Sequence, residues 1–221
     1  MQHKKYLQLL LLLTIFQFTL SCKKESIDAN GDRITVNRTP GIFHHIHTSG
    51  STPITISYGS VYQVEIKGSS NLVSKYQSTI SGEELNLGYE FIRLGKDDLS
   101  VHVTLPVFNK LTLSGSAKIQ ITGAFPEQAK FVSDISGSGQ IEVLGSMRAV
   151  ETRINMSGSG EALFKKLTSQ NAFLNISGSG DIENTVTDAL TASISGSGNI
   201  RYSGNAVVTK SISGSGRVFK E

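Results

Sequence analysis

Four oxygen-bearing residues hold equivalent positions in a repeated sequence and could together bind a hard cation. Gln140, Glu161, Asp181 and Asn199 each follow directly after a Ser-Gly-Ser-Gly segment. Carboxylate and amide oxygens are the ligands that Ca²⁺ prefers, and if the repeats stack as parallel strands, Glu161 lies about 5 Å from Asp181 on the next strand. A solvated face with screened repulsion explains the same residues without a ligand. We therefore retain Glu161 and Asp181 as candidate cation ligands and assign no metal site.

A histidine cluster, His44-His45-Ile46-His47, is a second candidate for metal binding. On a strand, His45 and His47 share one face, a spacing compatible with a metal ligand pair. The sequence around them supplies no cysteine and no acidic residue to complete the set. We interpret the cluster as a polar edge strand, and we expect His102, which stands alone in a strand pattern, to point outward.

The sequence predicts no catalytic residues and no cofactor. Its serines are concentrated in repeats where backbone geometry explains them, so they indicate no Ser-His-Asp arrangement. The Gly-Ser-Gly runs lead into strands, whereas a phosphate-binding loop leads into a helix and usually brings a lysine. A polysaccharide lyase on a similar scaffold needs a base and acidic residues that converge on one face. We keep an envelope or extracellular glycan-active enzyme as the alternative to a non-enzymatic protein.

The elements that position these residues are copies of one repeat. Ile-Ser-Gly-Ser-Gly occurs at Ile135–Gly139, Ile176–Gly180, Ile194–Gly198 and Ile212–Gly216, with variants at Met156–Gly160 and Leu113–Ala117. From Ser114 onward, the first serines of successive copies are 22, 21, 20, 18 and 18 residues apart. Such a period indicates a short supersecondary unit that stacks on copies of itself.

Side-chain alternation within the repeat predicts how it folds. In the extended segment Ile135–Ile141, the two isoleucines and two glycines face one side and the intervening serines face the other. Inward glycines between inward isoleucines predict a narrow corner where a Cβ atom would be crowded. Stacked copies then place the serines in outward ladders and set Asn155 above Asn175, so that identical polar side chains can hydrogen-bond along the stack.

These patterns predict an all-β fold, a parallel β-helix-like solenoid with rungs of 18–22 residues. Residues 34–110 alternate apolar and polar residues less regularly, with turn segments such as Ser49-Gly50-Ser51, and residues 111–221 carry the repeats. Together they form one predicted domain, 34–221, in which 71–76 is the only expected helical turn. An antiparallel meander is disfavoured because the repeats lack Asn-Gly and Asp-Gly turns, and a flexible linker is disfavoured by the regular isoleucines.

The N-terminus predicts export and lipidation. Residues 1–21 combine Lys4 and Lys5 with an apolar run, Leu9–Phe16, that is too short to span a membrane. The only cysteine, Cys22, follows directly and resembles the modified cysteine of a bacterial lipobox, although Thr19 stands where leucine is usual. We predict a lipoprotein signal peptide (1–21) and a lipidated Cys22 with a polar tether (22–33). The alternative is ordinary cleavage that leaves a free thiol.

The charge of the mature chain gives no electrostatic reason to bind nucleic acid. The whole chain carries a formal charge of +3. Removal of Lys4 and Lys5 with the leader leaves 19 basic against 18 acidic residues. The balance is then about +1, too small to attract a polyanion.

Residues 34–219 also resemble a known family. The similar segments are Gly41–Phe43, Ile54–Ile56, Tyr62–Gly68, Leu99–Pro106, Leu111–Ser116 and the later repeats. They resemble the head-GIN domain of putative auto-transporter adhesins, a family of secreted or lipid-anchored proteins common in the Bacteroidetes. The resemblance implies a right-handed β-helix-like stack, and it supplies no catalytic or ligand residues.

These observations together predict a non-enzymatic, lipid-anchored cell-envelope protein, specifically an outer membrane lipoprotein on the periplasmic or surface face. It would act as an adhesin-like binding or structural module. Its predicted partners are the membrane, through the lipid, and surface glycans or proteins, with an oligomeric scaffold as a further option because the ends of a solenoid expose strand edges.

Overall fold

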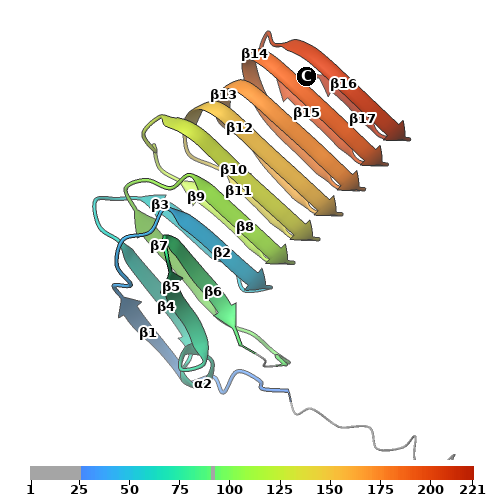
Figure 1. Cartoon of the computed structure of the whole chain (residues 1–221). Helices are drawn as coiled ribbons and strands as arrows, with labels where there is room; N and C mark the ends of the chain where they lie inside the picture. The colour runs from blue at the N-terminus through green and yellow to red at the C-terminus, as the bar shows by residue number, and fades with distance from the viewer. Residues whose placement is uncertain (1–25, 91–92) are drawn as a thin grey trace, which may run out of the picture.

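The computed structural model describes residues 26–90 and 93–221, and these residues form a stack of β coils (Figure 1). The predicted signal peptide and Cys22 lie outside the described residues. The strands are β1 (Arg33–Arg38), β2 (His45–Gly50), β3 (Ile54–Tyr58), β4 (Gln63–Ser69), β5 (Tyr76–Ser81), β6 (Glu84–Tyr89), β7 (Ser100–Leu105), β8 (Lys110–Gly115), β9 (Lys118–Thr122), β10 (Gln128–Gly137), β11 (Gln140–Val143), β12 (Met147–Gly158), β13 (Glu161–Gly178), β14 (Asp181–Gly196), β15 (Asn199–Ser203), β16 (Val207–Gly214) and β17 (Arg217–Lys220), and the helix is α2 (Ser70–Val73). Within these ranges, no helix is long and apolar enough to cross a membrane.

Each coil contributes to two walls of parallel strands. The front wall runs in the order β6, β2, β8, β10, β12, β13, β14, β16. The back wall runs in the order β7, β3, β9, β11, β13, β14, β15, β17. Strands β13 and β14 are long enough to belong to both walls. The predicted parallel β-solenoid is therefore confirmed.

The repeat sets the register of the front wall as the spacing predicts. Ser114 pairs with Ser136, and the pairing continues in register through the later first serines to Ser213. The copies are parallel, so the antiparallel meander is wrong for this part of the chain. The spacing shortens from 20 to 18 residues between β13 and β14 without loss of front-wall register, because irregularities between these two strands absorb the difference.

The chain order of the coils is not their spatial order. Ser49 pairs with Ser114, and Ile54 pairs with Ile119, so β2 and β3 form a coil that carries an earlier copy of the repeat. The chain then continues through β4, α2 and β5 to β6 and β7, which stack on the opposite side of β2 and β3. Ser49-Gly50-Ser51 is thus a corner of the solenoid as well as a turn.

Antiparallel strands close the N-terminal end of the stack. β1 pairs with β4, β4 pairs with β7, and β5 pairs with β6, all antiparallel. The short helix α2 lies where a helical turn was predicted, and Figure 1 shows these elements at the base of the stack. Residues of the predicted tether also contact this cap: Ile27 bridges Leu94, and the Lys96 N–H donates to Asp28 Oδ1 at 2.7 Å. The cap gives the parallel edge a partner, which protects it from other chains.

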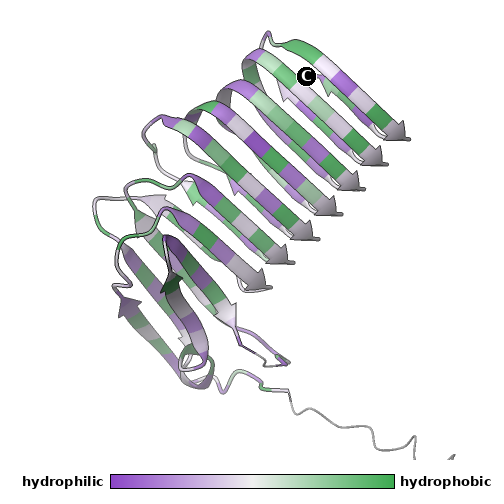
Figure 2. Cartoon of the chain, in the orientation of Figure 1, coloured by the Kyte–Doolittle hydropathy of each residue, from purple (hydrophilic) through white to green (hydrophobic). Residues whose placement is uncertain are grey.

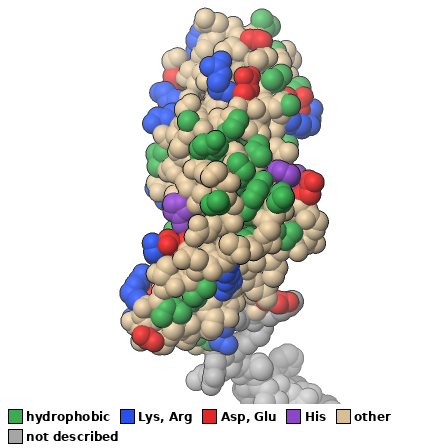
Figure 3. All heavy atoms as spheres, turned by 90° about the vertical axis from the view of Figure 1, so that its left-hand side faces the viewer, with side chains coloured by type: hydrophobic (Ala, Val, Ile, Leu, Met, Phe, Trp, Pro, Cys, Tyr) green, Lys and Arg blue, Asp and Glu red, His purple; other side chains and the backbone are tan. Residues whose placement is uncertain are grey.

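Aliphatic side chains from both walls fill the interior, and the alternation of apolar and polar residues is visible along each strand (Figure 2). Aromatic rings continue this core from coil to coil, with Phe108 5.1 Å from Phe125 and 5.6 Å from Phe131. Apolar side chains also gather outside, on the side formed by the connections from the back wall to the front wall (Figure 3). Tyr58 and Leu144, at the ends of back-wall strands, are exposed in this way.

The two glycines of each Ser-Gly-Ser-Gly corner have different structural roles. The second, such as Gly139, is buried, and a Cβ there would lie 2.6 Å from Leu113 Cδ2 in the interior, as the alternation predicts. The first, such as Gly137, is not simply inward, because its φ of 118° lies in the left-handed region and turns the chain. A Cβ on Gly137 would meet the carbonyl oxygen of Gly115 in the adjacent coil. The corner thus requires glycine twice, once for space and once for conformation and space together.

Tyr76 gives the capped end of the stack a predicted sensitivity to alkali. Its ring is buried and packs edge-on against Tyr89 with centroids 5.0 Å apart. Burial, and then the nearby Asp97 carboxylate, raises the pKa of the Tyr76 phenol well above its usual value of 10.0.

We expect stability to fall as pH rises above about 10, because the unfolded chain then releases a proton that folded Tyr76 retains. Urea midpoints measured at about pH 8 and pH 11 should show a smaller alkaline loss for Tyr76→Phe than for the wild type. Exposed Tyr58 supplies the control, since Tyr58→Phe should keep the wild-type loss. Equal losses in all three proteins would contradict this account.

Candidate functional site

Two columns of polar side chains cross the outer face of the front wall. The serine column contains the in-register residues Ser49, Ser114, Ser136, Ser157, Ser177 and Ser195. Two residues earlier on each strand lies the amide column, which contains Asn86, His47, Thr112, Asp134, Asn155, Asn175 and Ser193. Residues between the columns, such as Ile135 and Ile176, point into the core. Strand alternation therefore brings both columns to the solvent side.

Hydrogen bonds connect the amide column along the stack. Asn175 Nδ2 donates to Asn155 Oδ1 at 2.9 Å, and Asn155 Nδ2 donates to Asp134 Oδ1 at 2.9 Å. The predicted stacking of Asn155 and Asn175 is thus confirmed. His47 extends the column toward the cap, with Nδ1 3.2 Å from Asn86 Oδ1. These contacts hold the side chains in one line, which fixes the shape of the surface beside them.

A groove of about 460 Å³ lies along these columns from β8 to β14. Its lining residues are Thr112, Asp134, Ile135, Ser136, Asn155, Met156, Ser157, Asn175, Ile176, Ser177, Ser193 and Ser195. Serine is the largest side chain in its column here, so no bulky residue interrupts the groove. The surface exposed to a ligand combines hydroxyl and amide groups with the carbon atoms of short side chains and backbone.

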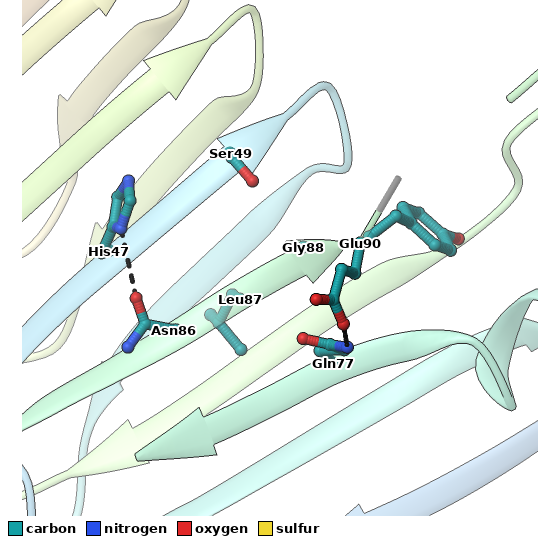
Figure 4. A pocket seen from close by; sticks show the side chains of 8 residues that line it. His47, Ser49, Gln77, Asn86, Leu87, Gly88 and Glu90 are labelled. Atoms are coloured by element: carbon teal, nitrogen blue, oxygen red, sulfur yellow. Dashed lines mark hydrogen bonds between the residues drawn. The ribbon is translucent and has the colours of Figure 1, made fainter. Parts of the chain in front are cut away.

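A pocket of about 320 Å³ lies on the same line at the capped end (Figure 4). It is lined by His47, Ser49 and Asn86, which belong to the two columns, and by Gln77, Leu87, Gly88, Tyr89 and Glu90. Gly88 pairs with Gln77 and continues the serine column without a side chain. A Cβ on Gly88 would lie 2.6 Å from Ser49 Oγ, so this glycine opens the pocket. Gln77 Nε2 donates to Glu90 Oε2 at 2.6 Å on the far side.

The charges of the groove and the pocket suit a neutral or cationic ligand. Among the described residues, their ionisable lining groups are Asp134, His47, Glu90 and the Tyr89 phenol, and no lysine or arginine lines either. Lys110 approaches from one side, with Nζ 3.5 Å from Asp134 Oδ2. The two columns place hydroxyl and amide groups in rows along the stack, where a bound molecule could form hydrogen bonds with several coils at once.

The candidate cation ligands Glu161 and Asp181 are neighbours, as predicted, but on the back wall. Each already accepts from an amide group. Gln140 Nε2 donates to Glu161 Oε2 at 2.5 Å, and the backbone N–H and Nδ2 of Asn199 both donate to Asp181 Oδ1 at 3.0 Å. The described part of the chain holds no group of three or more His, Cys, Asp or Glu residues arranged for a metal ion. Cation binding at Glu161 and Asp181 stays a prediction.

The histidine cluster does not form an edge strand, so that interpretation is wrong: β2 pairs with β6 on one side and with β8 on the other. The cluster also has acidic neighbours that the sequence did not reveal. His47 Nδ1 lies 3.9 Å from Glu84 Oε1, and His44 Nδ1 lies 3.8 Å from Glu83 Oε2. The glutamates come from β6 and the turn before it, which pack beside β2 only because the coils are stacked out of chain order. His102 is exposed and points outward, as expected, with Nε2 2.6 Å from Ser57 Oγ.

Stacked parallel coils with a groove between polar side-chain columns on one wall define a β-solenoid with a candidate binding surface. The chain belongs to the family described as "Putative auto-transporter adhesin, head GIN domain", whose family model matches residues 42–206. The predicted family is therefore confirmed.

Solved structures of three Bacteroidetes proteins share the fold. A putative adhesin from Bacteroides fragilis is 18% identical with a TM-score of 0.68, covering 89% of this chain and 100% of that one. A putative lipid binding protein from Parabacteroides distasonis is 20% identical with a TM-score of 0.64 and the same coverage. A putative adhesin from Parabacteroides merdae is 19% identical with a TM-score of 0.58, covering 89% and 99%. No curated protein matches the chain.

Proposed function

We propose that this protein is a non-enzymatic binding module of the bacterial cell envelope that binds surface molecules through the front-wall groove. The observation that carries the proposal is the polar line, the two side-chain columns that run past the pocket and the groove over seven front-wall strands. His47 lies between the pocket and the groove, with Nε2 3.4 Å from Ser114 Oγ. Membership of a family described as adhesins supports a binding role. The solved structures described as a putative adhesin and as a putative lipid binding protein are compatible with that role.

A glycan-active enzyme is the weaker candidate because the polar line lacks a matched acid and base. Asp134 is the ionisable residue of the groove lining, and its carboxylate accepts from Asn155. In the pocket, His47 contacts Asn86 and Glu90 accepts from Gln77. General acid–base catalysis needs two such groups directed at one reacting bond, whereas Asp134 is paired with Lys110 and Asn155, and His47 lies between Asn86 and Glu84.

We further propose that a lipid on Cys22 anchors the protein to the outer membrane. Because residues 26–32 contact the cap, only residues 23–25 separate Cys22 from the described chain. Four residue steps span at most about 14 Å. The anchor would hold the capped end close to the membrane, with the stack and its groove extending outward.

Two measurements test these proposals. Radiolabelled palmitate should label the wild-type protein and not Cys22→Ala, and the variant should leave the membrane fraction. Equal labelling of both proteins would refute the lipid anchor. Arrays of glycans and of envelope proteins, probed with the purified chain, should identify a bound molecule. An array signal that persists when the front groove is blocked would refute the proposed binding surface.

A further inference from the structure

We infer that the ligand of the front groove is an extended polysaccharide without anionic groups, running along the stack and across the strands. This inference rests on the proposed function, because it names the ligand class of the same groove. The polar line through the pocket and the groove crosses β6, β2, β8, β10, β12, β13 and β14. With about 4.8 Å between neighbouring strands, it is about 29 Å long.

The period of the surface matches a repeating polymer. Each coil presents one member of the amide column and one of the serine column, and the next coil presents the equivalent pair one strand spacing further on. That spacing is close to the length of one sugar unit in an extended β-linked chain. A polymer of this kind can repeat its contacts at every coil, so its affinity grows with the number of units bound.

The chemistry of the lining also favours sugars. Serine hydroxyls, such as those of Ser157 and Ser177, are exposed along one side, and the amides of Asn155 and Asn175 are exposed along the other. Between them the surface is mainly carbon. A sugar ring has the complementary arrangement, with hydroxyl groups at its edge and C–H groups on its faces. Lys110 offsets the charge of the Asp134 carboxylate, and no lysine or arginine among the described residues lines the groove, so the lining offers no cationic group to pair with a polyanion.

A polypeptide fits this surface less well. Peptides that bind sheets in extended form add to a free strand edge. The groove strands β8, β10, β12, β13 and β14 each have a hydrogen-bonded neighbour on both sides. The face between them is a carbon surface bordered by rows of hydroxyl and amide groups, which repeats from coil to coil.

The pocket lies at the capped end of the polar line. Gln77 on β5 occupies the next position of the serine column beyond Gly88, and its side chain reaches Glu90. The pocket therefore lies between a long side chain and Ser49, and it takes the terminal unit of the chain. The acceptor oxygens of Gln77, Asn86 and Glu90 can accept from sugar hydroxyl groups or from an amino group.

Titration calorimetry with soluble β-linked oligosaccharides of increasing length tests the inference. The probes are cello-oligosaccharides and chitosan oligosaccharides of about two to eight units, with oligogalacturonates as the anionic comparison. We expect affinity for a neutral or amino series to rise on the order of a hundredfold between two units and a chain that spans the line. Equal affinity at all lengths, or preferred binding of oligogalacturonates, would overturn the inference.

A matched pair of variants locates the binding. Ser157→Tyr puts a ring into the middle of the groove, whereas Ser159→Tyr puts the same ring on the exposed corner two residues later in the same repeat. Long oligosaccharides should bind Ser157→Tyr no better than short ones do, and Ser159→Tyr should keep the wild-type length dependence. If no oligosaccharide binds but another array molecule binds through the groove, the inference fails and the proposed function stands.

Discussion

Replacing Gly178 with alanine is expected to lower the free energy of unfolding by about 4 kcal/mol, the sum of backbone strain and overpacking. Gly178 has a φ of 134°, a conformation that side chains with a Cβ rarely adopt. The added Cβ would also meet the carbonyl oxygen of Gly158 in the adjacent coil, where backbone cannot move aside. Urea denaturation of the variant and the wild type measures the loss.

Gly50 separates the two causes, because it holds the same position in the earliest copy of the repeat. Its φ is 98°, yet a Cβ there would meet no atom within 4 Å. Gly50→Ala should therefore cost about 1 to 2 kcal/mol, from strain alone. Exposed Ser179 provides a further control, since Ser179→Ala should change stability by less than about 0.5 kcal/mol. A loss for Gly178→Ala no larger than that for Gly50→Ala would contradict the close contact between coils.

Replacing Asn184 with alanine is expected to lower the free energy of unfolding by about 2 to 3 kcal/mol, because it leaves buried polar groups without partners. The register between β13 and β14 shifts between Phe164 and Thr168, where the longer coil has extra residues. The buried Asn184 side chain supplies hydrogen bonds at this point, where the strand pairing is interrupted. Its Nδ2 donates to the carbonyl oxygen of Leu167 at 2.9 Å, and its Oδ1 accepts from Ser169 Oγ at 3.0 Å.

A double-mutant cycle with Ser169→Ala tests whether these buried groups act together. Because Ser169 and Asn184 share a hydrogen bond, the two losses should be less than additive by at least about 0.5 kcal/mol. Asn175→Ala removes an exposed asparagine that also donates to a neighbouring coil, and it should cost less than about 0.5 kcal/mol. Two outcomes would contradict this account. One is that the stability losses of Ser169→Ala and Asn184→Ala are additive, and the other is that Asn175→Ala and Asn184→Ala lower the free energy of unfolding equally.

The sequence predicted the contacts that follow from a fixed period in a parallel stack. Once the first serines of successive repeats are in register, residues at the same distance from those serines lie next to each other in neighbouring coils. This is why the Asn155–Asn175 and Glu161–Asp181 neighbours were predicted correctly. The same logic predicted the buried second glycine of each corner, because alternation alone places it inside.

The contacts that the sequence did not predict come from the first third of the chain. Ser49 lies 65 residues before Ser114, its register partner, because β4 to β7 intervene in the chain. Stacking in chain order gives no reason to pair them, so neither the pocket at Gly88 nor the glutamates near the histidines could be predicted. The left-handed φ of Gly137 also escapes an argument from alternation, which assumes an extended backbone throughout.

Binding of the array-identified molecule to Ser177→Tyr and Ser179→Tyr tests the central claim most directly. The two serines belong to one repeat and are both exposed, but Ser177 lines the groove and Ser179 lies on the corner beyond it. We predict that Ser177→Tyr abolishes binding while Ser179→Tyr retains the wild-type affinity, with both variants folded by circular dichroism. Wild-type affinity in Ser177→Tyr would contradict the assignment of the front-wall groove as the binding surface.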